Sequence, residues 1–130
     1  MMNKPNAQGS HVFLDYTGYS KPAEEDGKWM LGMLERVVEE SSARKVHAHV
    51  EQFDGAISPS GFAAVVLIDE SHISAHCYSE KGWLAIDCFT CGTTNPNTLA
   101  DEIHRCLVQH IPEIQLERRK HIDRFLHGGE

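Results

Sequence analysis

The sequence predicts an α+β domain, with a mostly antiparallel sheet and two helices on one face, and three observations lead to that class. The chain has 130 residues, enough for one compact domain over 1–130 and too few for two independent cores. Its apolar residues mark six short strand-like segments and two helical ones. Their order is β-α-β-β-β-β-α-β, and such consecutive runs of strands favour a mostly antiparallel sheet.

The expected elements follow one another with short connections. The strands are 11–16, 45–53, 62–68, 72–78, 83–90 and 113–118, and the helices lie at about 22–42 and between Asn95 and Ile111. Such a sheet leaves its second face bare. A second copy of the chain is the simplest cover, which predicts a homodimer with layers in the order αββα.

The first two elements follow from local patterns. Val12 and Leu14 share one face of the first strand. Ser20 stands ahead of Pro22, which suits the first helical position, and acidic residues then favour the positive end of a helix. Apolar residues at three- and four-residue spacing continue this helix to about residue 42.

The next two strands differ in pattern. Segment 45–53 alternates, with Val46 and the apolar residues at every second position after it expected to face inward. After a loop over 54–61, segment 62–68 is apolar without alternation. This pattern indicates a strand covered on both faces, by a helix and by a partner subunit.

Segments 72–78 and 83–90 form an antiparallel hairpin around a short turn. If Tyr78 faces Trp83, then Ser71 lies opposite Thr90 and Cys91 emerges beside Ser71. Opposed residues point the same way, so one sheet face carries His72, Ser74, His76, Ala85, Asp87, Phe89 and Cys91.

The last two elements are a helix and a short strand. Asn95 and Pro96 open the helix, and Leu99 begins an apolar stripe along it. Ile111 and Pro112 end it, and the final strand follows.

Charge and hydropathy narrow the range of functions. The 12 basic and 19 acidic residues give a net charge of −7, which argues against a nucleic-acid partner. No apolar run approaches the roughly 20 residues that span a bilayer, and the N-terminal residues lack the apolar core of a signal peptide. We therefore expect a cytoplasmic protein with no membrane partner. The four cysteines are then expected to be reduced.

Three other kinds of site fit these residues less well. Cys88 and Cys91 have Cys-x-x-Cys spacing, but residues three apart on a strand face opposite ways, which disfavours a zinc or redox pair. Histidines two or four apart on strands also occur on ordinary exposed faces, so no metal is expected. A serine hydrolase needs a Gly-x-Ser-x-Gly elbow, which is absent. The residues alone indicate a candidate nucleophile at Ser71 and leave its reaction open.

Two segments carry a family resemblance. The run Glu-Ser-His-Ile-Ser-Ala-His over 70–76 and the run Asp-Cys-Phe-Thr-Cys-Gly over 87–92 are highly specific together. In these runs, in its length and in its order of elements, the chain resembles the short prokaryotic S-adenosylmethionine decarboxylase proenzymes. These are pyruvoyl enzymes of polyamine (spermidine) synthesis.

The resemblance implies a mechanism and assigns roles to residues. Ser71 attacks the carbonyl of Glu70, and cleavage yields fragments 1–70 and 71–130 with a pyruvoyl group derived from Ser71. That group forms a Schiff base with a small amino-acid-type substrate and takes up electrons as CO₂ leaves, so neither metal nor pyridoxal phosphate is implied. His76 matches the base of self-cleavage, Cys91 the general acid of decarboxylation, and Glu80 the acid that binds the ribose hydroxyls.

Some positions depart from the family pattern. Ala63 replaces a Ser or Thr that assists processing, so Ser58, Ser60 or Ser74 is expected to compensate. Ile57 replaces the Phe that stacks on adenine. The substrate alternatives are therefore S-adenosylmethionine, which we expect first, and arginine or ornithine. A relative that no longer cleaves itself and serves as a binding subunit is a further alternative.

Overall fold

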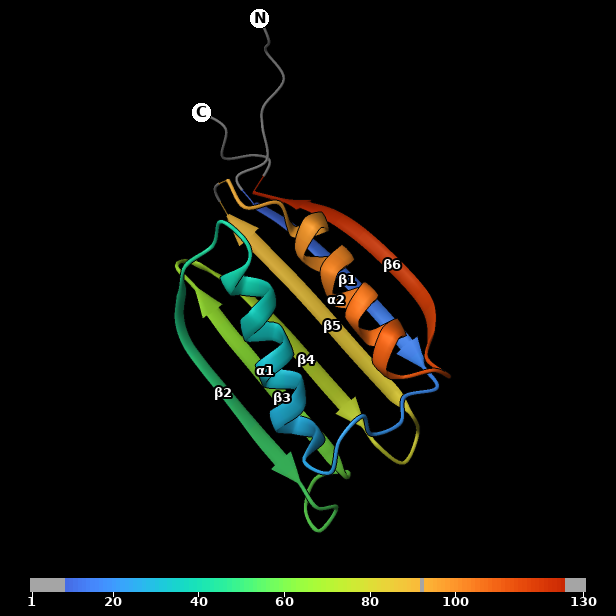
Figure 1. The fold of residues 1–130 in the computed structure, drawn as a ribbon. Helices are drawn as coiled ribbons and strands as arrows, with labels where there is room; N and C mark the ends of the chain where they lie inside the picture. Colours follow the sequence, from blue (N-terminus) through green and yellow to red (C-terminus); the bar gives the residue numbers. More distant parts are fainter. Residues whose placement is uncertain (1–8, 92, 126–130) are drawn as a thin grey trace, which may run out of the picture.

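Six strands form one antiparallel sheet, and both helices lie against the same face of it (Figure 1). The computed structural model describes residues 9–91 and 93–125. Along the chain the elements are β1 (Gly9–Thr17), α1 (Asp26–Glu39), β2 (Lys45–Phe53), β3 (Gly61–Ile68), β4 (Ser71–Tyr78), β5 (Trp83–Cys91), α2 (Pro96–His110) and β6 (Gln115–Arg124). Across the sheet the order is β2-β3-β4-β5-β1-β6, and every neighbouring pair is antiparallel. The predicted fold class is confirmed.

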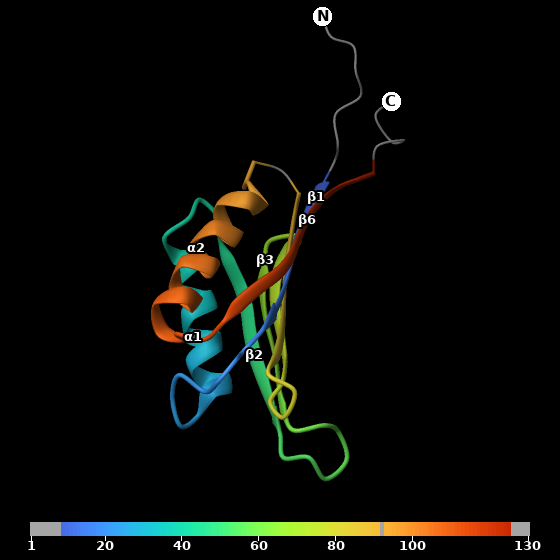
Figure 2. The same cartoon turned by 90° about the vertical axis from the view of Figure 1, so that its right-hand side faces the viewer.

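The core lies between the sheet and the helices. Figure 2 shows the two layers from the side, with α1 and α2 together on one side of the sheet. Strand residues alternate between this covered face and the face turned away from the helices, which we call the outer face. The buried side chains of the core include Val12, Leu14, Leu34, Phe62, Val66, Ile73, Ile86, Leu99, Ile103 and Leu107.

The outer face carries apolar side chains that the described part of the chain leaves half-buried or exposed. Leu67 is 40% exposed. Phe13, Val65, Ala85 and Phe89 are half-buried on the same face. A bare sheet face of this composition favours burial against another protein surface.

The first helix begins later than predicted. It starts at Asp26, not near Pro22, and ends at Glu39. The Asp26 carboxylate is buried and accepts hydrogen bonds from the Tyr19 hydroxyl at 2.8 Å and the Gln52 amide at 3.3 Å. Because this tertiary network fixes the first turn, the helix begins there and the local capping signals do not set its start.

Two strand predictions also need correction. Val46 is 53% exposed, because the ladder between β2 and β3 is irregular between Lys45 and His47. The final strand, β6, is Gln115–Arg124 and not 113–118, since it pairs with β1 along its whole length.

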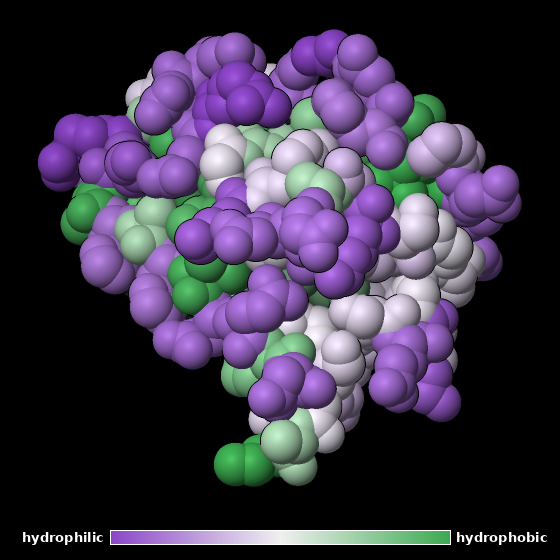
Figure 3. Space-filling model, turned by 60° about the horizontal axis from the view of Figure 1, so that its bottom comes forward, coloured by the Kyte–Doolittle hydropathy of each residue, from purple (hydrophilic) through white to green (hydrophobic). Residues whose placement is uncertain are grey.

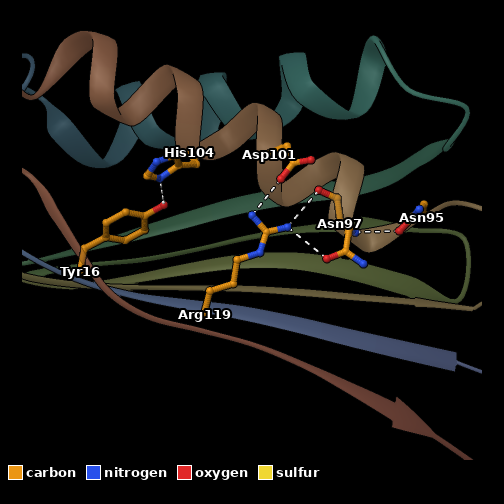
Figure 4. Close-up of polar contacts among 6 residues, drawn as sticks. All are labelled: Tyr16, Asn95, Asn97, Asp101, His104 and Arg119. Carbon is orange, nitrogen blue, oxygen red and sulfur yellow. Dashed lines mark hydrogen bonds and ion pairs between the residues drawn. The ribbon is translucent and has the colours of Figure 1, made fainter.

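Polar contacts join α2 to β1 and β6 (Figure 4). The Arg119 guanidinium donates to the Asp101 carboxylate at 2.8 Å and to the Asn97 side chain at 3.1 Å. The Tyr16 hydroxyl lies 2.9 Å from His104 Nδ1. Burial raises the pKa of Tyr16 well above its ordinary value, so the phenol stays protonated in this contact. These bonds hold α2 against β1, the neighbour of β5, and against the edge strand β6.

Candidate active site

The hairpin of β4 and β5 has the register that the sequence predicts. His72 pairs with Phe89, Ser74 with Asp87, and Tyr78 with Trp83 across the two strands. The residues predicted to share one face therefore do so, and that face is the outer one.

Ser71 and Cys91 meet where β4 begins and β5 ends. The backbone N–H of Cys91 donates to Ser71 Oγ at 2.9 Å. Ser71 is buried and Cys91 half-buried. Gly9 lies opposite Cys91 on β1, and a Cβ at Gly9 would lie 3.3 Å from Cys91 Sγ, so the glycine leaves room beside the thiol.

A hollow of about 280 Å³ opens beside these two residues. Glu70 also borders it, so the bond between Glu70 and Ser71 lies at its wall. Its other lining residues come from the ends of neighbouring elements and are Ser42, Ala43, Ile68, Asp69, Thr93 and Thr94.

His76 lies away from Ser71. It sits on the outer face of β4, opposite Ala63 on β3, and is exposed. Five positions of strand separate it from Ser71, about 16 Å at the rise of a β-strand, and the two side chains point to opposite faces. The structure therefore does not bring His76 to Ser71 within one chain.

A second hollow of about 360 Å³ lies on the outer face at His76. Ala63 and Ser74 line it together with His76, whereas Ser58 and Ser60 do not. Three serines were expected to substitute for the hydroxyl that Ala63 lacks, and of these Ser74 lines this hollow.

Glu80 and Ile57 lie in loops at the His76 end of the sheet. Glu80 is exposed in the turn between β4 and β5, and Tyr78 and Trp83 flank that turn with ring centroids 6.3 Å apart. Ile57 is 99% exposed in the loop between β2 and β3. Figure 3 views this end of the molecule, where hydrophobic side chains appear as separate spots among hydrophilic ones. No described contact joins Ile57 to the rest of the site.

Two groupings were not predicted from the sequence. His11 Nε2 lies 2.9 Å from the Asp87 carboxylate on the outer face, near His72. Burial lowers the pKa of His72, which Asp87 partly opposes and His11 reinforces. Asp69, in the turn before Ser71, accepts a hydrogen bond from Arg44 at 2.7 Å. No local sequence signal links these pairs, because each joins different strands or turns.

The cysteines differ in environment. Burial raises the pKa of Cys77 to about 12, and also that of Cys88 to about 12, so both thiols stay protonated and inert in the core. Cys91 is half-buried at the hollow. Within 9–91 and 93–125 no group of three or more His, Cys, Asp or Glu side chains could hold a metal ion. No described helix is long and apolar enough to cross a bilayer.

Comparison with known proteins covers nearly the whole chain. The family model described as S-adenosylmethionine decarboxylase matches residues 10–120. An S-adenosylmethionine decarboxylase proenzyme 2 of Bacillus cereus is 31% identical over 120 residues, which are 92% of this chain and 89% of the relative. An S-adenosylmethionine decarboxylase proenzyme of Methanococcus maripaludis is 32% identical over 116 residues, covering 88% of this chain and 92% of that one.

A solved structure agrees with the fold. The crystal structure of the adenosylmethionine decarboxylase from Aquifex aeolicus superimposes with a TM-score of 0.64 at 25% sequence identity. The match covers 92% of each chain.

Proposed function

Since the chain belongs to the S-adenosylmethionine decarboxylase family, we propose that it is a self-processing, pyruvoyl-dependent enzyme that decarboxylates S-adenosylmethionine. The decarboxylated product is the aminopropyl donor of spermidine synthesis. The observation that carries the proposal is the meeting of Ser71 Oγ and the Cys91 backbone beside one hollow, at the bond between Glu70 and Ser71.

The first step of self-cleavage uses groups already in place at this turn. Ser71 Oγ bonds to the carbonyl carbon of Glu70 while the peptide C–N bond breaks, which leaves an ester and a free amine. Removal of the α-proton of residue 71 then breaks the Cβ–Oγ bond, and the oxygen departs with Glu70 as a carboxylate. The oxygen of a water molecule then replaces the backbone nitrogen of residue 71, which leaves as ammonia. The Cys91 N–H fixes the position of Ser71 Oγ before the first step.

The hollow beside residue 71 leaves space for a pyruvoyl group at that position. Once bound to substrate, that group supplies a carbonyl that accepts the electrons released with CO₂. Cys91 lies at the same hollow, on the side of the outer face, and serves as the acid that returns a proton to the substrate carbon. The buried Cys77 and Cys88 point to the core and take no part.

We propose further that His76 acts on a neighbouring chain. About 16 Å of β4 separates it from Ser71, which excludes proton transfer within one chain. If two outer faces pack about a two-fold axis that crosses β4, the Ser71 end of one chain faces the His76 end of the other. The apolar side chains of the outer face support such a homodimer. Each site then takes Ser71 and Cys91 from one protomer and His76 from the other.

Substrate selection falls to the loops at the His76 end. The Glu80 carboxylate can accept hydrogen bonds from ribose hydroxyls or pair with a basic amino acid. Ile57 offers no ring for adenine, and Phe62 is buried in the core. Tyr78 and Trp83, 45% and 49% exposed, are the aromatic side chains beside Glu80. Decarboxylation of arginine or ornithine is therefore the second candidate, favoured by the exposed isoleucine.

Three measurements test the proposal. Intact-mass analysis should find fragments 1–70 and 71–130, the second lighter by one ammonia than the plain peptide, while Ser71→Ala stays whole. Release of CO₂ should then be measured with carboxyl-labelled S-adenosylmethionine, arginine and ornithine. A wild-type chain that stays whole after long incubation contradicts self-processing, and turnover of arginine or ornithine alone contradicts the substrate. Sedimentation equilibrium should give twice the chain mass, and a monomer would contradict the composite site.

A further inference from the structure

The turn before Ser71 has an unusual backbone. Asp69 and Glu70 form a two-residue connection between the paired residues Ile68 and Ser71. Asp69 has a φ of 51°, in the left-handed region, where side chains other than glycine are uncommon and Asp and Asn are tolerated best. The conformation at Asp69 sets the direction in which Glu70 presents its carbonyl to Ser71.

An ion pair holds this turn from the neighbouring strand. Arg44 Nη2 donates to Asp69 Oδ1 at 2.7 Å, and Arg44 lies directly before β2. Lys45, the next residue, pairs with Ile68, so the β2–β3 ladder ends beside the turn and places Arg44 at its rim. The contact joins residues 25 positions apart.

Cleavage changes the charge at this place. Before it, the side chains of Asp69 and Glu70 contribute two carboxylates. Afterwards the α-carboxylate of Glu70 adds a third at the same turn, and the peptide nitrogen of Ser71 has left as ammonia. The Arg44 guanidinium is the cation that the structure pairs with this turn, and a guanidinium binds carboxylates through several donors.

We propose that Arg44 is a positioning residue for self-cleavage. Before the cut it holds the Asp69 carboxylate and with it the left-handed turn that aims the Glu70 carbonyl at Ser71 Oγ. After the cut it holds the new C-terminus of the first fragment. The inference rests on the proposed self-processing and adds a residue outside the Ser71, His76 and Cys91 set.

The test compares cleavage rates of freshly synthesised chains. Arg44→Ala should slow cleavage by about 2- to 5-fold, the effect of losing one partly exposed ion pair, and Arg44→Lys should retain most of the rate. Asp69→Asn keeps a residue suited to the left-handed turn but removes the charge, so it should slow cleavage about as much as Arg44→Ala. Lys45→Ala is the matched control, because it breaks the neighbouring 2.8 Å ion pair with Glu35 away from the turn, and it should cleave at the wild-type rate.

Two further readouts separate positioning from stability. The same substitutions on a Ser71→Ala background, which cannot cleave, should leave the melting temperature within about 2 °C of the parent chain. Carboxypeptidase should trim the end of fragment 1–70 faster in Arg44→Ala than in the wild type.

The outcomes distinguish this inference from the proposed function. A wild-type chain that never cleaves removes the proposed function and the inference together. A wild-type chain that cleaves while Arg44→Ala cleaves equally fast overturns the role of Arg44 alone. Equal slowing in Lys45→Ala, or slowing that only follows a loss of melting temperature, likewise overturns it.

Discussion

A composite site predicts that two inactive chains restore each other. Ser71→Ala removes the nucleophile, and His76→Ala removes the base, so neither chain should cleave alone. When both are produced in one cell, a mixed dimer holds one site with Ser71 from the His76→Ala chain and His76 from its partner. That site should process, and the other site should stay dead.

The yield follows from random pairing. Equal production makes about half of the dimers mixed, so about half of the His76→Ala chains should be cut and none of the Ser71→Ala chains. Different affinity tags on the two chains let a denaturing gel assign each fragment. The double variant Ser71→Ala/His76→Ala is the control partner, and it should rescue nothing. The composite site is wrong if the His76→Ala chain stays whole in mixed dimers isolated through both tags, or if it cuts when produced alone.

Four other outcomes are expected. Cys91→Ala should lower kcat by more than it raises KM, because protonation follows the loss of CO₂. Cys106→Ala should leave both constants unchanged, and wild-type turnover in Cys91→Ala would refute the role of Cys91 as general acid. Ile57→Phe should raise S-adenosylmethionine turnover several-fold, roughly 1 kcal/mol of stacking, and the arginine or ornithine alternative predicts a decrease on those substrates instead. Ala63→Ser should speed self-cleavage beyond the wild type, and no change in rate would show that no hydroxyl is needed there. Because the pKa of His72 is lowered from 6.5 in the folded chain, the unfolded chain binds more protons just below that pH. The free energy of unfolding of the Ser71→Ala chain, measured by urea titration, should therefore fall as pH drops below 6.5, and it should fall less steeply in His72→Gln. An equal dependence of this free energy on pH in the two chains would refute the assignment.

The sequence predicted the type and order of all eight elements because most of them carry a local period or an apolar run that ends at a local stop signal. The register of β4 and β5 was also predictable, since a short turn and the alternation of side chains leave few choices. The meeting of Ser71 and Cys91 follows from that register alone.

Other features depend on contacts between distant segments. The start of α1 is set by buried Asp26 and its partners, which outweigh the local signal at Pro22. β6 is a charged edge strand without clear alternation, so its length emerges only from its ladder with β1. The pair of Arg44 and Asp69 depends on where the β2–β3 ladder ends, which an irregularity near Lys45 shifts.

The strand order has a consequence for the protein after the proposed cut. The first fragment supplies β1, β2 and β3, and the second supplies β4, β5 and β6, yet β1 lies between β5 and β6. The two products are thus interleaved, and neither can leave without breaking ladders on both sides of β1 as well as the one between β3 and β4. Once such a molecule unfolds, its two fragments are separate chains, so refolding requires a second-order encounter between them and slows on dilution. The uncut precursor, by contrast, refolds at a rate that is independent of concentration.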